Sequence, residues 1–225
     1  SDKLMKRTSN RPLATGVIGK KEATIFATVI GLLALSVFQI YTTSLATFLT
    51  FIAIAFYVII YTVALKKRTS QNIVWGGAAG CTPALIGWAA VTNSLSVTAW
   101  SFFLLIFFWT PPHFWALAIK YKDDYAAASI PMLPVVASKV HLLRQMWVYT
   151  TAMIATSIAL IINAGLQTWA MAITIALGLV FAAQLRGLDE KSENYEKTAG
   201  KIFQWSITYL SLLSVLLVVA QLLKA

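Results

Sequence analysis

The chain has 225 residues, of which 59% are apolar and only 12% are charged. About a quarter of the residues are charged in soluble domains, so this composition excludes an ordinary soluble domain and indicates a helical membrane protein. A net charge of +10 would suit a nucleic-acid-binding protein, but the charges lie in short segments between apolar runs, which is typical of membrane orientation, and we expect no nucleic-acid partner.

The chain opens on a basic, polar segment, 1–22. Lys3, Arg7 and Arg11 recur at every fourth position, so a helix places Lys3 and Arg7 on one face. Arg11 precedes Pro12, which disfavours helix and ends the turn there. Because the chain starts abruptly without an initiator methionine, we interpret it as a fragment whose beginning is missing.

Seven apolar runs follow, each approaching the ~20 residues that cross a hydrocarbon core. We therefore predict an all-α fold, a polytopic bundle of membrane-spanning helices embedded in the lipid bilayer. The predicted spans are 23–39, 45–65, 73–91, 100–119, 146–162, 169–185 and 202–222.

The charges support this number of spans. With seven spans, the segments 1–22, 66–72, 120–144 and 186–201 face one side and hold 17 of the 18 Lys and Arg and all eight Asp and Glu. The opposite loops carry no charge, and only Lys224 lies with them. By the positive-inside rule, we expect the charged side to be cytoplasmic.

The third span contains Gly76 and Gly80, a pair typical of close helix packing, although close packing can also line a cavity. In the fourth span, Pro111 and Pro112 release backbone carbonyls that a lipid-facing segment could not tolerate. We expect that helix to break toward a cavity, followed by a loop that carries carboxylates over its mouth. The second, fifth and sixth spans show no candidate functional residue, and we interpret them as structural scaffold.

Four groups of side chains are candidates for chemistry at the charged side. Asp123 and Asp124 can supply paired oxygen ligands to Mg²⁺. They can equally be part of a solvated surface that binds no ligand. Arg7 and Arg11 suit phosphate oxygens, whereas Lys20, Lys21 and Lys66 are better explained by topology.

The third and fourth groups lie around the end of the fourth span. His113 lies seven residues before Lys120, about 10 Å along a helix, and can ligate a metal or haem iron, transfer a proton, or bond a freed carbonyl. The aromatic residues that crowd this stretch can stabilise a cation or belong to an interfacial belt.

Four segments of the sequence resemble a known family. The strings DKLMKRTSNRPL, KKRTSQNIVWGGAAGCTPALIGWAAVT, WTPPHFWALAI and KDDYAAASIPMLPVV are similar to the haem O synthase branch of the UbiA-type intramembrane prenyltransferases. The first string is shared across the superfamily, and the last two are specific to the branch. The resemblance implies nine transmembrane helices, of which seven are present, so the first two are missing.

The resemblance also implies the reaction: a farnesyl group passes from farnesyl diphosphate to a vinyl group of haem B. Mg²⁺ would be held by Asp2, Asp123 and Asp124, with Arg7 and Arg11 beside the diphosphate. Asp2 is the last residue of an N-x-x-x-D-x-x-x-D motif, and because its earlier members would precede residue 1, we expect this chain to bind Mg²⁺-diphosphate weakly or to be inactive. The implied substrate contacts are Arg68, Asn72, His113, Trp115, Lys120 and Tyr125.

The resemblance places the protein in a bacterial inner membrane and names haem A synthase or oxidase assembly proteins as candidate partners. Three alternatives stay open, of which the last is a non-catalytic assembly protein. The first is another prenyltransferase of the superfamily, acting on a quinone precursor or a tetrapyrrole. The second is a membrane transporter, with His113, Asp123 and Asp124 as an ion path, although a transporter more often buries such groups near the midplane and shows repeated halves.

Overall fold

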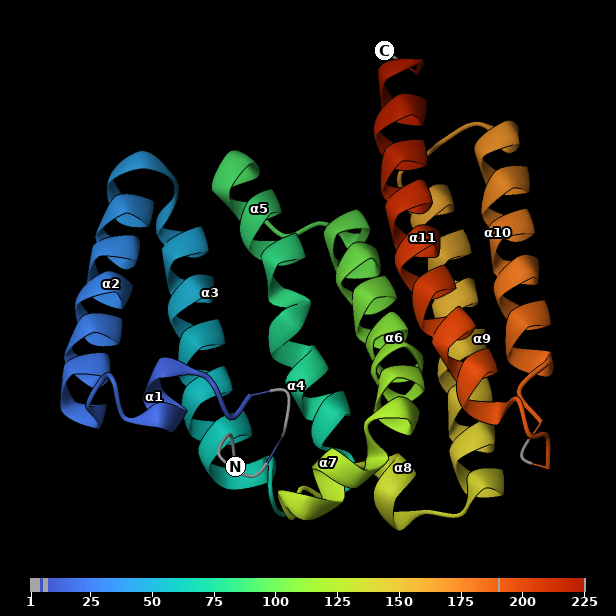
Figure 1. Ribbon diagram of the computed structural model, residues 1–225. Helices are drawn as coiled ribbons and strands as arrows, with labels where there is room; N and C mark the ends of the chain where they lie inside the picture. The colour runs from blue at the N-terminus through green and yellow to red at the C-terminus, as the bar shows by residue number, and fades with distance from the viewer. Residues whose placement is uncertain (1–4, 6–7, 190, 225) are drawn as a thin grey trace.

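The computed structural model describes residues 5, 8–189 and 191–224, and these residues form helices joined by short connections, with no strand among them (Figure 1). The elements are α1 (Pro12–Thr15), α2 (Lys20–Tyr41), α3 (Ser44–Ala55), η2 (Phe56–Leu65), α4 (Asn72–Gly80), α5 (Thr82–Thr92), α6 (Val97–Lys120), α7 (Lys122–Ala127), α8 (Leu133–Val136), α9 (Lys139–Asn163), α10 (Thr168–Arg186) and α11 (Tyr195–Leu222).

The seven predicted spans are confirmed. Seven helical stretches are long and apolar enough to cross a membrane: α2, α3 with η2, α4 with α5, α6, α9, α10 and α11. The shortest, α10, has 19 residues, which is roughly 28 Å of helix and close to the thickness of the hydrocarbon core.

Two of these helices begin seven residues earlier than predicted. α9 starts at Lys139 instead of 146, and α11 starts at Tyr195 instead of 202. Both extensions are polar turns, which an apolar pattern cannot detect, and both lie at the charged end. The Ser138 side chain caps α9 by accepting a hydrogen bond from the His141 backbone N–H at 3.2 Å.

α6 is the central helix of the bundle. It packs against α4, α5, α8, α9 and α11, and it has the largest buried share of any span. Our prediction that it breaks at Pro111 and Pro112 is wrong, because α6 is continuous through both prolines. Both prolines are buried, and the carbonyls that they leave without N–H partners belong to the half-buried Phe107 and Phe108. The helices packed around α6 allow it to continue through proline.

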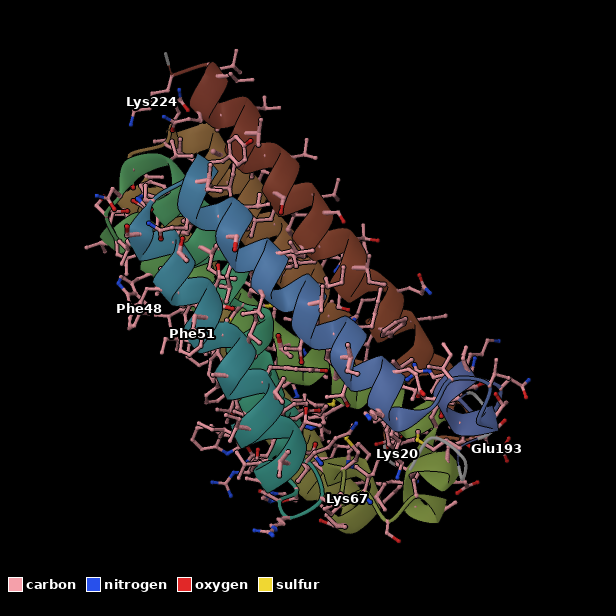
Figure 2. All side chains as sticks on the ribbon, turned by 90° about the vertical axis from the view of Figure 1, so that its left-hand side faces the viewer. Lys20, Phe48, Phe51, Lys67, Glu193 and Lys224 are labelled. Atoms are coloured by element: carbon pink, nitrogen blue, oxygen red, sulfur yellow. The ribbon has the colours of Figure 1, made fainter. Side chains whose placement is uncertain are left out.

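The outer helices turn apolar side chains away from the bundle. α2 has no buried residue and packs against α3. Figure 2 shows Phe48 and Phe51 of α3 pointing outward, and they are 59% and 53% exposed. Large exposed apolar surfaces of this kind are rare in soluble monomers and fit contact with lipid, so the protein is a multi-pass membrane protein.

The charged connections gather at one end of the bundle, as the alternation of loops predicts. In Figure 1 α1, α7 and α8 lie at the end opposite the C-terminus, and in Figure 2 Lys20, Lys67 and Glu193 lie far from Lys224. The Lys224 Nζ donates a hydrogen bond to the Ala164 carbonyl at 3.0 Å, which ties α11 to the uncharged loop between α9 and α10.

Candidate functional site

A cavity of about 780 Å³ lies among α3, η2, α4, α6 and the segment that carries α7 and α8. Its size is within the range of small-molecule sites, about 300–1,000 Å³. Within the described chain, residues from before α2 also line it, namely Met5, Thr8 and Arg11. The cavity therefore joins parts of the chain that are far apart in sequence.

The two ends of this cavity differ in polarity. Its polar lining lies at the charged end of the bundle, with Arg11, Lys66, Asn72 and Tyr125 among the lining residues. The rest of the wall is mostly apolar and includes Ile54, Val58 and Ile106. Such a cavity suits a ligand that has a charged head and an apolar tail.

The glycines of α4 explain how the cavity forms. A Cβ on Gly76 would lie 2.8 Å from the Tyr61 ring, and one on Gly77 would lie 2.9 Å from Thr110 Cγ2. These two glycines allow α4 to approach η2 and α6. The prediction of close packing is therefore confirmed at Gly76, whereas Gly80, the other residue of the predicted pair, makes no close approach. Gly80 also lines the cavity, and a Cβ there would meet no heavy atom within 4 Å. Small residues thus permit packing and leave room in the cavity.

Asn72 is the most buried polar residue of the lining. It is 1% exposed, and its Nδ2 donates a long hydrogen bond of 3.3 Å to the Lys66 carbonyl. Its Oδ1 is buried and has no hydrogen-bond partner in the described chain. A buried acceptor without a partner is uncommon and costly in folded proteins, which marks Asn72 as a candidate for ligand contact.

The predicted cations fall into three groups. Arg11 lines the cavity, and so does Lys66, which the sequence analysis had assigned to topology alone. Arg68 and Lys120 are exposed outside the lining, and Lys120 Nζ lies 5.7 Å from the Tyr121 ring centroid. Arg7 lies outside the described residues. Two cations thus border the polar end of the cavity.

The predicted carboxylates lie nearby but do not line the cavity. Asp123 and Asp124 occupy the first turn of α7, where Asp123 is exposed and Asp124 half-buried. The predicted loop is thus partly helical, since α7 and α8 lie within it. Tyr125, the next residue, does line the cavity.

The donor chemistry at this end fits Mg²⁺ in part. Among the described residues, no group of three His, Cys, Asp and Glu side chains lies close enough to hold a metal ion. Asp2, the third predicted ligand, lies outside those residues. Asp123 and Asp124 supply two hard oxygen donors, and Mg²⁺ characteristically takes few carboxylates and completes its shell with water and phosphate oxygens.

His113 lies beside the cavity and outside its lining. Its ring is held between Trp109 and Phe203, with ring centroids 4.2 and 4.6 Å away, and it meets the edge of Phe114 at 5.0 Å. Trp109 and Phe114 both line the cavity. An aromatic stack therefore runs from the cavity wall through His113 to α11.

Trp115 faces a different part of the bundle. Its side chain is fully buried, and its ring meets Tyr149 of α9 edge-on at 5.4 Å. Its Nε1 has no hydrogen-bond partner among the described residues. Of the candidate substrate contacts, the structure thus brings Asn72 and Tyr125 to the cavity, while Arg68, His113, Trp115 and Lys120 lie outside its lining.

Sequence reasoning missed the part of the wall formed by the second span. Tyr57 and Tyr61 line the cavity from η2, with ring centroids 5.3 Å apart. η2 is a π-helix of 10 residues, closed by a hydrogen bond from the Lys66 N–H to the Tyr61 carbonyl at 2.8 Å. π-Helical turns are rare and often occur at functional sites. The only sequence signal was two tyrosines four positions apart in a run that we had assigned to scaffold.

Comparison with known proteins agrees with this architecture. A relative named Protoheme IX farnesyltransferase from Kineococcus radiotolerans is 44% identical over 229 residues, which cover 95% of this chain and 68% of the relative. One of the same name from Streptomyces avermitilis is 43% identical, covering 99% and 74%. One from Mycolicibacterium smegmatis is 48% identical over 185 residues, covering 82% and 60%. No solved structure matches the chain.

The family profile covers nearly the whole chain. The UbiA prenyltransferase family matches residues 1–220, which include every wall of the cavity. The protein therefore belongs to the UbiA prenyltransferase family.

Proposed function

We propose that the protein transfers the farnesyl group of farnesyl diphosphate to a vinyl group of haem B, giving haem O for terminal oxidase assembly. One observation carries the proposal: a UbiA-family chain, similar along most of its length to proteins named Protoheme IX farnesyltransferase, contains a mostly apolar cavity with basic and polar side chains at one end.

The diphosphate binds at the polar end of this cavity. Arg11 and Lys66 line that end. Arg68, which is exposed outside the lining, and Arg7 are proposed as further cations for the diphosphate. A guanidinium group matches phosphate oxygens with two parallel hydrogen bonds, and a lysine adds a compact charge. Asn72 and Tyr125 complete the contacts around the head of the substrate.

Asp123 and Asp124, together with Asp2, would hold Mg²⁺ for this head group. When bound, the ion neutralises charge that develops on the leaving diphosphate. The protein's own contribution is the set of positioned cations, which stabilise the same charge without rearrangement.

The farnesyl tail lies in the apolar part of the cavity. The bond between the allylic carbon and the diphosphate oxygen breaks, and its electron pair leaves with the diphosphate. Tyr57, Tyr61 and Trp109 present aromatic rings to the cavity, and such rings stabilise a nearby cation. The apolar walls limit the access of bulk water, which would otherwise capture the allylic cation.

Haem B approaches on the side where Trp109 joins the cavity to His113. Its vinyl group supplies the electrons for the new carbon–carbon bond, and water then captures the resulting cation and loses a proton. His113 contacts the haem, Trp115 supports the wall behind it, and Lys120 offers a charge to a propionate at the end of α6. The vinyl group reaches the allylic carbon beside Trp109, which lines the cavity.

The same proposal sets the orientation and the setting of the protein. We propose that the charged end faces the cytoplasm of a bacterial cell and that the bundle lies in the inner membrane, because Lys and Arg are retained on the cytoplasmic side. A haem A synthase or an oxidase assembly protein is the partner that would receive the product.

The test is product analysis of the protein, expressed with any upstream residues that its gene encodes. The membranes are incubated with haem B, farnesyl diphosphate and Mg²⁺, and the extracted haems are analysed by mass spectrometry. We expect haem O, and a drop in kcat/KM of about a hundredfold or more in the double variant D123N/D124N. Prenylation of a quinone precursor with no change in haem B would contradict the proposal.

A further inference from the structure

Ser206 of α11 is hydrogen-bonded to the ring of His113 on α6. Ser206 Oγ lies 2.6 Å from His113 Nδ1, and it also lies 2.6 Å from the Phe203 carbonyl oxygen one turn earlier. The Ser206 carbonyl in turn accepts a hydrogen bond of 2.8 Å from Trp109 Nε1. Trp109 and His113 of α6 are thus both hydrogen-bonded to Ser206 of α11.

These distances fix where the protons lie. A serine hydroxyl has one proton, and the Phe203 carbonyl has none, so a 2.6 Å contact between the two oxygens requires the hydroxyl proton to lie between them. Ser206 Oγ is then an acceptor toward the ring, and His113 Nδ1 must carry the proton that it accepts. The other ring nitrogen, Nε2, is left with a free lone pair.

The ring has little freedom to turn away from this arrangement. It is stacked on Trp109 at an interplanar angle of 19° and on Phe203 at 28°. The hydrogen bond to Ser206 is the only one found for the His113 side chain in the described chain, and Nε2 is not among the sealed atoms that lack partners. In a neutral ring Nε2 is therefore unprotonated, its direction is set by the two stacked rings, and it is not a sealed atom.

We infer that Ser206 is a positioning residue that holds His113 in the Nδ1–H form and so presents Nε2 to the iron of the haem substrate. The identity of that iron rests on the proposed function. A metal binds the unprotonated nitrogen of a neutral imidazole, and the group bonded to the other nitrogen sets the tautomer and the ring orientation. Ser206 is the group that is hydrogen-bonded to the other nitrogen of His113.

A matched serine elsewhere in the bundle shows what a purely structural role looks like. Ser157 of α9 donates a hydrogen bond to the Met153 carbonyl at 2.8 Å and lies 2.6 Å from the Tyr209 hydroxyl. Ser157 and Ser206 are both fully buried, and each links α11 to another helix. Only Ser206 has an imidazole as its partner, so S157A is the control for S206A.

The first experiment measures the tautomer in the wild-type protein without haem. The chain contains two histidines, so ¹⁵N-histidine labelling gives a simple solid-state NMR spectrum, and H141Q assigns the exposed one. We expect the His113 shifts of an Nδ1–H imidazole. An Nε2–H form, or a mixture of the two, would overturn the inference whatever the enzyme's activity.

The second experiment titrates haemin into the purified wild type, H113A, S206A and S157A and records the Soret band and the iron–histidine vibration. We expect H113A to lose the iron–histidine vibration and added imidazole to restore it. We expect S206A to bind haemin about tenfold to a hundredfold more weakly, with a shifted vibration, and S157A to match the wild type. Wild-type affinity and spectrum in S206A, or an equal loss in S157A, would overturn the inference.

The two experiments separate failure of the inference from failure of the proposed function. If the wild type does not bind haemin, haem B is not the acceptor substrate and His113 is not a ligand of its iron. The NMR result still decides whether Ser206 fixes the tautomer of His113. If S206A does not fold, S206T keeps the hydroxyl and is expected to restore the wild-type spectrum. An S206T variant that folds and lacks the iron–histidine vibration would contradict the role of the hydroxyl.

Discussion

Replacing Gly80 by leucine tests whether the apolar part of the cavity holds the prenyl tail. Gly80 lies eight residues beyond Asn72, roughly 12 Å along the helix from the polar end. A Cβ there meets no heavy atom within 4 Å, so the leucine occupies cavity space instead of forcing its neighbours apart. Its four side-chain carbons displace about as many tail carbons, which at ~0.8 kcal/mol each is about 3 kcal/mol.

That energy corresponds to about a hundredfold loss in kcat/KM for farnesyl diphosphate. A shorter substrate, geranyl diphosphate, does not reach as far and is expected to lose much less, so the ratio of the two activities shifts toward the shorter chain. The assay compares both substrates in competition, with the products separated by mass. Equal losses for both substrates would refute the reasoning.

Gly31 provides a matched control for this substitution. It lies in α2, outside the cavity, and a Cβ there also meets nothing within 4 Å. Both leucines replace a helical glycine and gain about 1 kcal/mol of helix propensity, so neither is expected to lower thermal stability. G31L is expected to keep the wild-type ratio of activities, and a shift in that ratio would show that the effect in G80L does not come from the cavity.

Three further substitutions probe packing, charge and burial. Gly77→Val places its side chain against Thr110 and is expected to lower the free energy of unfolding by about 1–3 kcal/mol, measured by thermal denaturation in detergent; unchanged stability would contradict the close approach of α4 and α6. Lys66→Met is expected to raise KM for farnesyl diphosphate about tenfold or more, and Lys20→Met, an exposed lysine outside the cavity lining, to leave it unchanged; equal KM values in both would remove Lys66 from the site. Asn72→Leu removes a buried acceptor that has no partner. It is expected to raise the free energy of unfolding of the ligand-free protein by about 1 kcal/mol and to weaken diphosphate binding. A lower free energy of unfolding with unchanged binding would contradict the role of Asn72.

The spans and their order could be predicted because each depends on the chain's local composition. An apolar run of sufficient length must be helical in a membrane, since its backbone groups have no other partners there. The same argument failed at Pro111 and Pro112. Whether a helix continues through proline depends on what surrounds the freed carbonyls, and α6 has neighbours on several sides.

The candidate site was less predictable, because its parts come from distant segments. Arg11, Asn72 and Tyr125 carried a sequence signal and do line one cavity. Lys66 was indistinguishable from a lysine that sets topology, since the two roles require the same residue at the same membrane edge. The partnership of His113 with Ser206 spans 93 residues, and nothing in the local sequence of either marks it.

The account depends most on the claim that the prenyl diphosphate occupies the cavity between η2 and α4. A farnesyl diphosphate analogue with a photoreactive group at the end of its tail tests this directly: after irradiation, the cross-linked peptides are identified by mass spectrometry. The account predicts cross-links on the cavity wall formed by α3, η2 and α4, which disappear when excess farnesyl diphosphate is added. Competable cross-links confined to α10, which contributes no residue to the cavity, would contradict it.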